Sequence, residues 1–199
     1  DYFDIEKITL DHLEKNGKLL SLGGDHSVTF PIIKAFHKYY PKLDILHIDA
    51  HADLYHEYEG DPYSHACPFA RIMENGFAVK LVQVGIRTLN PHQKEQAEKY
   101  GVDIHEMRNL DVKTIPKFQN PLYISLDMDG FDPAFAPGVS HHEPGGLSSR
   151  QVIELIQSIN TPVVGADIVE YNPDRDFQDM TAYLAAKMMK ELIGKMLKR

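Results

Sequence analysis

The stretch LDILHIDAHADLY, residues 43–55, joins an apolar run to three residues that can bind a metal ion. The run at 43–49 predicts a buried strand. Asp49, His51 and Asp53 end this stretch at two-residue spacing, and on an extended backbone that spacing points the three side chains to one side. We therefore expect a strand that runs out of the core and presents all three side chains to a single point.

Similar apolar runs recur along the chain, with amphipathic segments between them. We predict strands at 18–24, 43–49, 79–86, 121–127 and 162–170, and helices at 28–40, 67–76, 91–101, 148–159 and 180–197. This alternation indicates an α/β fold whose parallel sheet is covered on both faces. In such sheets the active site lies outside the carboxyl ends of the strands. The connection at 128–146 is much longer than the usual length of about 4–6 residues, so we expect it to be functional.

Composition restricts the classes of partner. The chain has 199 residues, of which 43% are hydrophobic and 25% charged, as is typical of one globular domain with a sizeable core. Its net charge of −8 argues against nucleic acid, and no apolar run approaches the roughly 20 residues that span a bilayer. We expect neither a nucleic-acid nor a membrane partner.

One cysteine, Cys67, excludes an internal disulfide and favours a reducing compartment. We expect Cys67 to be a small packed residue. The first ten residues are acidic and lack the layout of a signal peptide. The sequence therefore predicts a cytoplasmic protein, with an organelle-targeting segment ahead of residue 1 as the alternative.

Residues that can bind metal ions follow three of the predicted strands. The candidate metal ligands are His26, Asp49, His51, Asp53, Asp127 and Asp129. Each motif has an ordinary alternative by itself, because GGDHS at 23–27 also suits a turn before a helix and DMDGFDP at 127–133 suits an Asp-rich turn. Their joint occurrence at three strand ends favours a metal centre.

The ligand types restrict the metal. Four carboxylates and two imidazoles are too rich in oxygen for a structural zinc site and too many for one ion. Two hard or borderline divalent ions that share bridging carboxylates fit better, and mixed Asp and His ligation suits Mn²⁺. Two such ions about 3.5–4 Å apart activate a water between them. The expected chemistry is hydrolysis.

Five ordered motifs resemble those of the ureohydrolases, the family of arginase, agmatinase and their relatives. They are GGDHS (23–27), DAHAD (49–53), SLDMDGFDPAFAPG (125–138), EPGGL (143–147) and GADIVEYNPDRD (165–176). The resemblance implies a three-layer α/β/α sandwich with a mainly parallel sheet and two Mn²⁺ ions per chain. It also implies hydrolysis of a small guanidino compound to an amine and urea, by a homo-oligomer that is a trimer or a hexamer.

The resemblance also assigns roles to single residues. One ion would be held by His26, Asp49, Asp53 and Asp127, and the other by His51, Asp49, Asp127 and Asp129, so that Asp49 and Asp127 bridge. His65 matches the histidine that shuttles protons, a role that suits the pKa of imidazole; the alternative is an exposed loop histidine. Glu170 matches the glutamate that binds the guanidinium group, whose planar cation calls for a carboxylate. His47 lies inside the predicted strand at 43–49, where we expect it to be buried or to support a metal-binding side chain rather than bind the ion itself.

The substrate is less well defined by the sequence. Tyr55, Asn90 and His141 stand where animal arginases carry other residues that bind the substrate, so we treat these three as candidate substrate-binding residues. The stretches at 58–76 and 131–150 resemble plant-type arginases and their bacterial relatives. We expect an arginase, with an agmatinase or another guanidino-acid ureohydrolase as the main alternative. A catalytically silent homologue and a single-zinc deacetylase rank lower.

The resemblance begins at about residue 18, close to the start of the chain. Members of the family carry a substantial region before GGDHS. We therefore expect residues 1–199 to form a single arginase-like catalytic domain that lacks the N-terminal part, including one or two strands. A short member of the family with an exposed sheet edge is the alternative.

Overall fold

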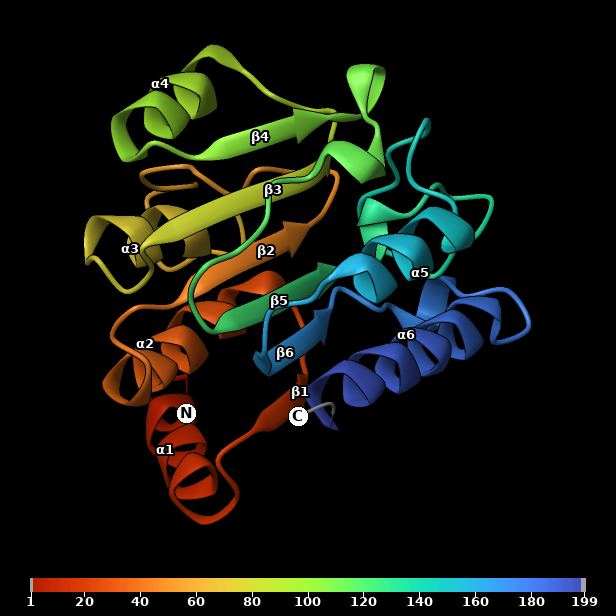
Figure 1. The fold of residues 1–199 in the computed structure, drawn as a ribbon. Coiled ribbons are helices and arrows are strands. Elements are labelled where there is room, and N and C mark those ends of the chain that lie inside the picture. The colour runs from red at the N-terminus through yellow and green to blue at the C-terminus, as the bar shows by residue number, and fades with distance from the viewer. Residues whose placement is uncertain (1, 198–199) are drawn as a thin grey trace.

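Six parallel strands form one sheet in the computed structural model, which describes residues 2–197 (Figure 1). The strands are β1 (Leu19–Leu22), β2 (Asp44–Ile48), β3 (Lys80–Ile86), β4 (Asp103–Glu106), β5 (Leu122–Asp127) and β6 (Val163–Val169). Their order across the sheet is β1-β6-β5-β2-β3-β4. Every residue of β2, β5 and β6 is buried, which accounts for their almost continuous apolar sequences.

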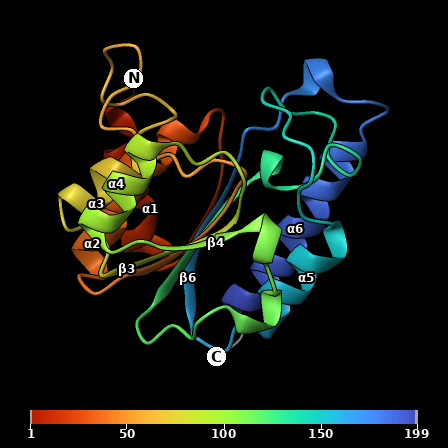
Figure 2. The ribbon, with the colours of Figure 1, turned by 90° about the horizontal axis from the view of Figure 1, so that it is seen from above.

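Helices cover both faces of the sheet (Figure 2). The helices are α1 (Asp4–Asn16), α2 (Thr29–Tyr39), α3 (Pro68–Glu74), α4 (Pro91–Tyr100), α5 (Ser149–Ser158) and α6 (Met180–Leu197). The first four lie on one face, and α5 and α6 lie on the other, each layer with its own apolar core. The predicted α/β/α sandwich is confirmed. Among the described helices, none has the length and apolar character needed to cross a bilayer.

Two elements were not predicted. Strand β4 has the sequence DIHE, all of it half-buried at the edge of the sheet, so it lacks the apolar run by which the other strands are recognised. Helix α1 is polar over most of its surface and ends at Gly17, whose φ is +70°. Leu13 is its fully buried contact with the core, too weak a pattern for a prediction.

The order of the strands gathers the motifs at one edge of the sheet. Strands β1, β6, β5 and β2 are neighbours and parallel, so their carboxyl ends meet there. The chain passes close to itself at this edge: a Cβ on Gly130 would lie 3.0 Å from the backbone N and Cα of Asp49, and a Cβ on Gly85 would lie 2.8 Å from the Asp49 carbonyl oxygen. Only glycine fits at these two positions, and Asp49 is held between them.

Candidate metal centre and active-site cavity

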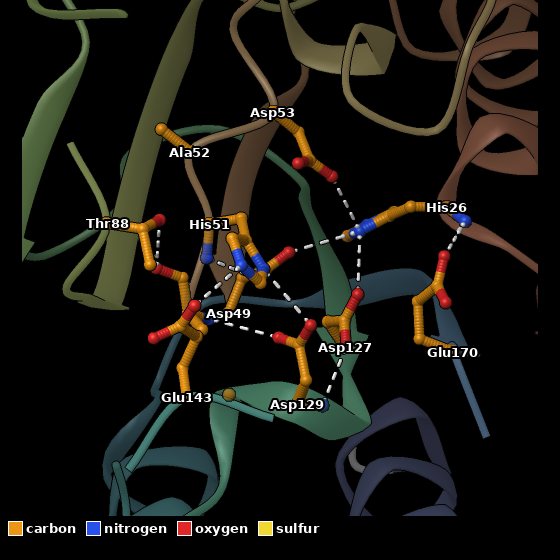
Figure 3. A network of polar contacts seen from close by, with 12 residues as sticks. His26, Asp49, His51, Ala52, Asp53, Thr88, Asp127, Asp129, Glu143 and Glu170 are labelled. Atoms are coloured by element: carbon orange, nitrogen blue, oxygen red, sulfur yellow. Dashed lines mark hydrogen bonds and ion pairs between the residues drawn. The ribbon is translucent and has the colours of Figure 1, made fainter. Parts of the chain in front are cut away.

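The six predicted metal ligands lie together at the carboxyl edge of the sheet (Figure 3). His26 begins the short 3₁₀ helix η1 (His26–Val28) that follows β1. Asp127 ends β5, and Asp129 lies in the 3₁₀ helix η4 (Met128–Gly130). The remaining candidate ligands follow β2; they are Asp49, His51 and Asp53.

His26 faces three carboxylates. Its Nδ1 lies 3.1 Å from Oδ2 of each of Asp49, Asp53 and Asp127. The ring is 1% exposed, and among the described residues this nitrogen has no hydrogen-bond partner. A buried nitrogen that faces three carboxylate oxygens, none of which has a proton to donate when ionised, is the arrangement that a cation would complete.

His51 forms a second group beside the first. Its Nδ1 lies 3.1 Å from Oδ2 of Asp129 and 3.5 Å from Oδ1 of Asp49. Asp49 thus offers Oδ2 to the His26 group and Oδ1 to the His51 group. Oδ2 of Asp127 faces His26, whereas its Oδ1 accepts from the backbone N–H of Asp129. The bridging role of Asp127 stays a prediction.

The carboxylates strongly affect one another and the two rings. Burial, with the nearby Asp129 and Asp49, raises the pKa of Asp127 well above its usual range, and burial with Asp49 raises the pKa of Asp129 to about 7. Burial lowers the pKa of His51, but contacts with Asp129 and Asp49 outweigh it and raise this pKa to about 12. The protein thus concentrates negative charge in a buried place, which is costly unless cations offset it.

Local turns aim the ligands. Oδ1 of Asp49 accepts from the backbone N–H of His51 at 2.6 Å, and Oδ1 of Asp127 accepts from that of Asp129 at 2.7 Å. Such turns arise from Asp two residues before the donor, so the spacing in the sequence encodes them. Asp53 has a φ of +49°, a conformation that non-glycine residues rarely adopt and that often marks functional sites.

His47 holds one of the ligands, as its place inside β2 suggested. Its Nε2 lies 2.7 Å from Oδ2 of Asp49, and its ring stacks on Phe69 with centroids 3.9 Å apart. The amide nitrogen of Gln83 lies 2.9 Å from Nδ1 of His47 and donates to the carbonyl of Ala52 at 2.6 Å. Gln83 was not predicted, because it lies inside the apolar run of β3.

A cavity of about 240 Å³ opens above the two groups. Its lining residues are His51, Asp53, Tyr55, Tyr58, His65, Ala66, Thr88, Gln93, Asp127, Asp129, His141, Glu143 and Glu170. Tyr55, His65 and His141 thus line the cavity, and their roles stay predictions. The His65 and His141 rings stack with centroids 5.6 Å apart. Tyr58, Thr88, Gln93 and Glu143 also line the cavity but were not among the predicted site residues.

Asn90 is placed differently from Tyr55 and His141. It does not belong to the lining of the cavity. Its Oδ1 accepts from the backbone N–H of Gln93 as the N-cap of α4, and its amide donates to the Tyr55 hydroxyl. Asn90 thus holds the Tyr55 hydroxyl without lining the cavity itself.

Glu170 lies just past the end of β6, with a φ of +63°. Its Oε1 accepts from the backbone N–H of His26 at 2.8 Å, and burial raises its pKa. Among residues 2–197, no lysine or arginine lines the cavity. A half-buried carboxylate at its wall is suited to a cationic ligand.

Arg87 fixes the long loop that forms one wall. Its guanidinium donates to the carbonyls of Glu143, Gly85, Asp129 and Phe131 at 2.6–3.2 Å. Burial lowers its pKa. The loop is thereby tied to the end of β3, a role that no local sequence pattern indicates.

Comparison with known proteins agrees with this geometry. Residues 3–194 match the model of the Arginase family. The chain belongs to this family. It is 52% identical over 189 residues to the mitochondrial arginase of Medicago truncatula, covering 90% of this chain and 56% of that protein. It is 40% identical over 199 residues to the N(1)-aminopropylagmatine ureohydrolase of Thermus thermophilus, covering 96% of this chain and 66% of that protein.

Solved structures of the family have the same fold. The arginase of Medicago truncatula superposes with a TM-score of 0.94 at 47% identity, covering 98% of this chain and 64% of that one. The proclavaminate amidino hydrolase of Streptomyces clavuligerus superposes with a TM-score of 0.91 at 30% identity, covering 98% of this chain and 69% of that one. The chain spans between half and two thirds of the length of the curated arginases it matches.

Proposed function

We propose that the protein is a dinuclear manganese hydrolase that releases urea from a guanidino substrate, with L-arginine as the leading substrate. The observation that carries this proposal is the pair of groups around Asp49, in which Nδ1 of His26 and Nδ1 of His51 each face carboxylate oxygens 3.1 Å away. The metal ligands would be the six residues of the two groups. Mixed oxygen and nitrogen donors fit Mn²⁺.

In this proposal a pair of bound Mn²⁺ ions supplies an activated water and polarises the substrate. The chain's own groups do the rest. Glu170 binds the guanidinium group and orients its carbon toward the two groups. His65, which also lines the cavity, gives a proton to the leaving amine as the carbon–nitrogen bond breaks, which yields urea and ornithine.

Arginine leads because relatives at about half identity are named arginases. Agmatine is the second candidate, for two reasons. The Thermus thermophilus relative is named for an agmatine derivative. In the part of the chain that the structure describes, no lysine or arginine lines the cavity to bind the α-carboxylate of arginine. Tyr55 and His141 remain the proposed substrate contacts, with Asn90 acting through Tyr55.

The deciding experiment compares urea release from arginine, agmatine and guanidinobutyrate in protein loaded with Mn²⁺, together with the metal content. We expect two manganese ions per chain and the highest kcat/KM with arginine. A clear preference for agmatine would replace the leading substrate by the second candidate. One zinc per chain would favour a deacetylase, and two metals without turnover of any guanidino compound would indicate a silent homologue.

We further propose that the chain works as a single catalytic domain in a homo-oligomer, a trimer or hexamer. Sedimentation equilibrium with and without Mn²⁺ would measure the mass; a monomer under both conditions would contradict this. The single cysteine suits a reducing compartment such as the cytoplasm, whereas the mitochondrial and chloroplastic names of plant relatives support an organelle. Imaging of the tagged protein in its source cells distinguishes the two.

A further inference from the structure

A row of buried polar residues crosses the sheet directly below the two groups. Gln83, His47, Ser125 and Asp167 are register partners on the neighbouring strands β3, β2, β5 and β6. All four are completely buried. Strands buried on both faces are normally apolar, so four polar residues side by side need a reason.

Asp167 is the charged member of this row, and three hydroxyl groups donate to it. Ser125 donates to Oδ1 at 2.6 Å, while Tyr123 and Thr29 both donate to Oδ2 at 2.9 Å. A buried carboxylate needs such donors. Because an ionised carboxylate can only accept, each of the three hydroxyl groups must be the donor in its hydrogen bond to Asp167.

The direction of the hydrogen bond from Ser125 to Asp167 determines which nitrogen of His26 carries the proton. A serine hydroxyl has one proton, and that of Ser125 goes to Asp167. The Ser125 oxygen can then only accept from Nε2 of His26, which lies 2.9 Å away. With the Nε2 proton held there, Nδ1 is the ring nitrogen left to offer a lone pair to a cation, and it is the nitrogen that faces Asp49, Asp53 and Asp127.

We propose that Asp167 and Ser125 are positioning residues that fix the tautomer of His26, so that Nδ1 is available to a metal ion. The proposal rests on the metal centre proposed above and adds to it two residues that do not contact the ion. Carboxylates that orient a metal-binding histidine through its other nitrogen are a general device of metal sites. Here the carboxylate acts through a hydroxyl group.

Three substitutions separate this role from simple filling of the core. Ser125→Ala removes the acceptor for Nε2. Tyr123→Phe is the matched control, because it removes one hydroxyl donor from the same carboxylate without touching the connection to His26. If Asp167 only needs hydrogen bonds, the two variants should affect metal binding equally.

Asp167→Asn keeps the shape of the side chain at position 167 but should reverse the direction of the hydrogen bond between Ser125 and His26. Because Tyr123 and Thr29 both donate to the Oδ2 position, the amide oxygen should stay there and the amide NH₂ should face Ser125. Ser125 would then donate to Nε2 of His26. The proton on the ring would move to Nδ1, where it blocks the metal.

The test titrates each variant with Mn²⁺ by calorimetry and follows the coupled Mn²⁺ pair by electron paramagnetic resonance. In wild type we expect two ions. Ser125→Ala and Asp167→Asn should weaken one of them by about 10–100-fold and replace the coupled signal by that of a single ion, whereas Tyr123→Phe should retain both. Equal metal affinity in wild type and the first two variants, or an equal loss in Tyr123→Phe, would overturn the proposal.

A measurement on wild type covers the case in which these variants do not fold. In protein loaded with diamagnetic Zn²⁺, the nitrogen NMR signals of His26 should show a proton on Nε2 and the metal on Nδ1. Metal on Nε2 overturns the tautomer assignment while leaving the dinuclear hydrolase intact. Wild type that binds no divalent ion at all overturns both.

Discussion

The backbone N–H of His26 donates a 2.8 Å hydrogen bond to Oε1 of Glu170. This bond joins His26, whose ring faces three carboxylates, to Glu170, the residue that we assign to the guanidinium group. It uses one oxygen of Glu170 and fixes the side chain, so the other oxygen is free to meet a substrate in a defined direction. In the proposed function, this backbone group therefore links substrate binding by Glu170 to the geometry of the metal centre.

Glu170→Gln should keep this hydrogen bond, because the amide oxygen still accepts, but it removes the negative charge. Hydrogen bonds to charged groups contribute about 1.5–3 kcal/mol, so we expect kcat/KM to fall roughly 10–100-fold. Metal content should not change. Steady-state urea release and metal analysis check both statements, and unchanged kcat/KM would remove Glu170 from substrate binding.

His65→Asn should lower kcat while both metal ions stay bound. His65 lines the cavity but is not one of the residues in the two groups. General acid catalysis contributes about 10²–10⁴-fold, and we expect a loss in that range. His142→Asn is the control, because this exposed histidine of the long connection at 128–146 binds the carbonyl of Pro137 and should be replaced with little effect. A variant at position 65 with normal turnover would contradict the assignment.

Removal of the metal should destabilise the fold. The His26 and His51 groups bring Asp49, Asp127 and Asp129 together in a buried place, so a ligand that binds only the native state adds stability by mass action. At a free Mn²⁺ concentration of about 100 Kd the gain is about 2.7 kcal/mol, or roughly 5–10 °C in Tm for a chain of this size. Thermal melts with Mn²⁺ and with a chelator measure it; identical Tm values would argue against a metal centre.

The grouping of the six candidate metal ligands could be predicted from the sequence because their arrangement is largely local. Asp49, His51 and Asp53 follow one strand at two-residue spacing, and the rule that sites lie at the carboxyl ends of parallel strands brings the separate motifs together. The fold followed from the same alternation of strands and helices. Strand β4 did not, because its four residues are polar and lie at the edge.

The residues that support the ligands could not be predicted this way. Gln83, Ser125 and Asp167 lie inside apolar strands, and they meet only because the strands are in register. Arg87 contacts carbonyls more than 40 residues away in the sequence. Such contacts depend on tertiary packing, for which a single sequence has no local signal.

Asp176 gives a prediction about pH that does not involve the metal. It accepts from the backbone N–H groups of Phe177, Thr181 and Ala182 at 2.8, 3.0 and 3.1 Å, and so caps the start of α6. Burial alone would raise its pKa, but these N–H groups and the Thr181 hydroxyl outweigh it and lower the pKa. A pKa lowered in the folded state means that Asp176 stabilises the fold above its unfolded pKa of about 3.9. This contribution is lost as the pH falls through the folded value.

Asp176→Ala should therefore cost about 1–2 kcal/mol at pH 7, the usual range for a lost helix cap. The cost should shrink as the pH falls below about 3.9, because the unfolded chain then binds a proton at this carboxylate that the folded chain binds only at lower pH. Urea unfolding of wild type and variant at pH 7 and at pH 3, both with chelator present, measures the difference. Asp174→Ala, at an exposed position nearby, is the control and should cost little at either pH. A cost for Asp176→Ala that is the same at both pH values would show that the side chain stabilises α6 by packing rather than by its charge.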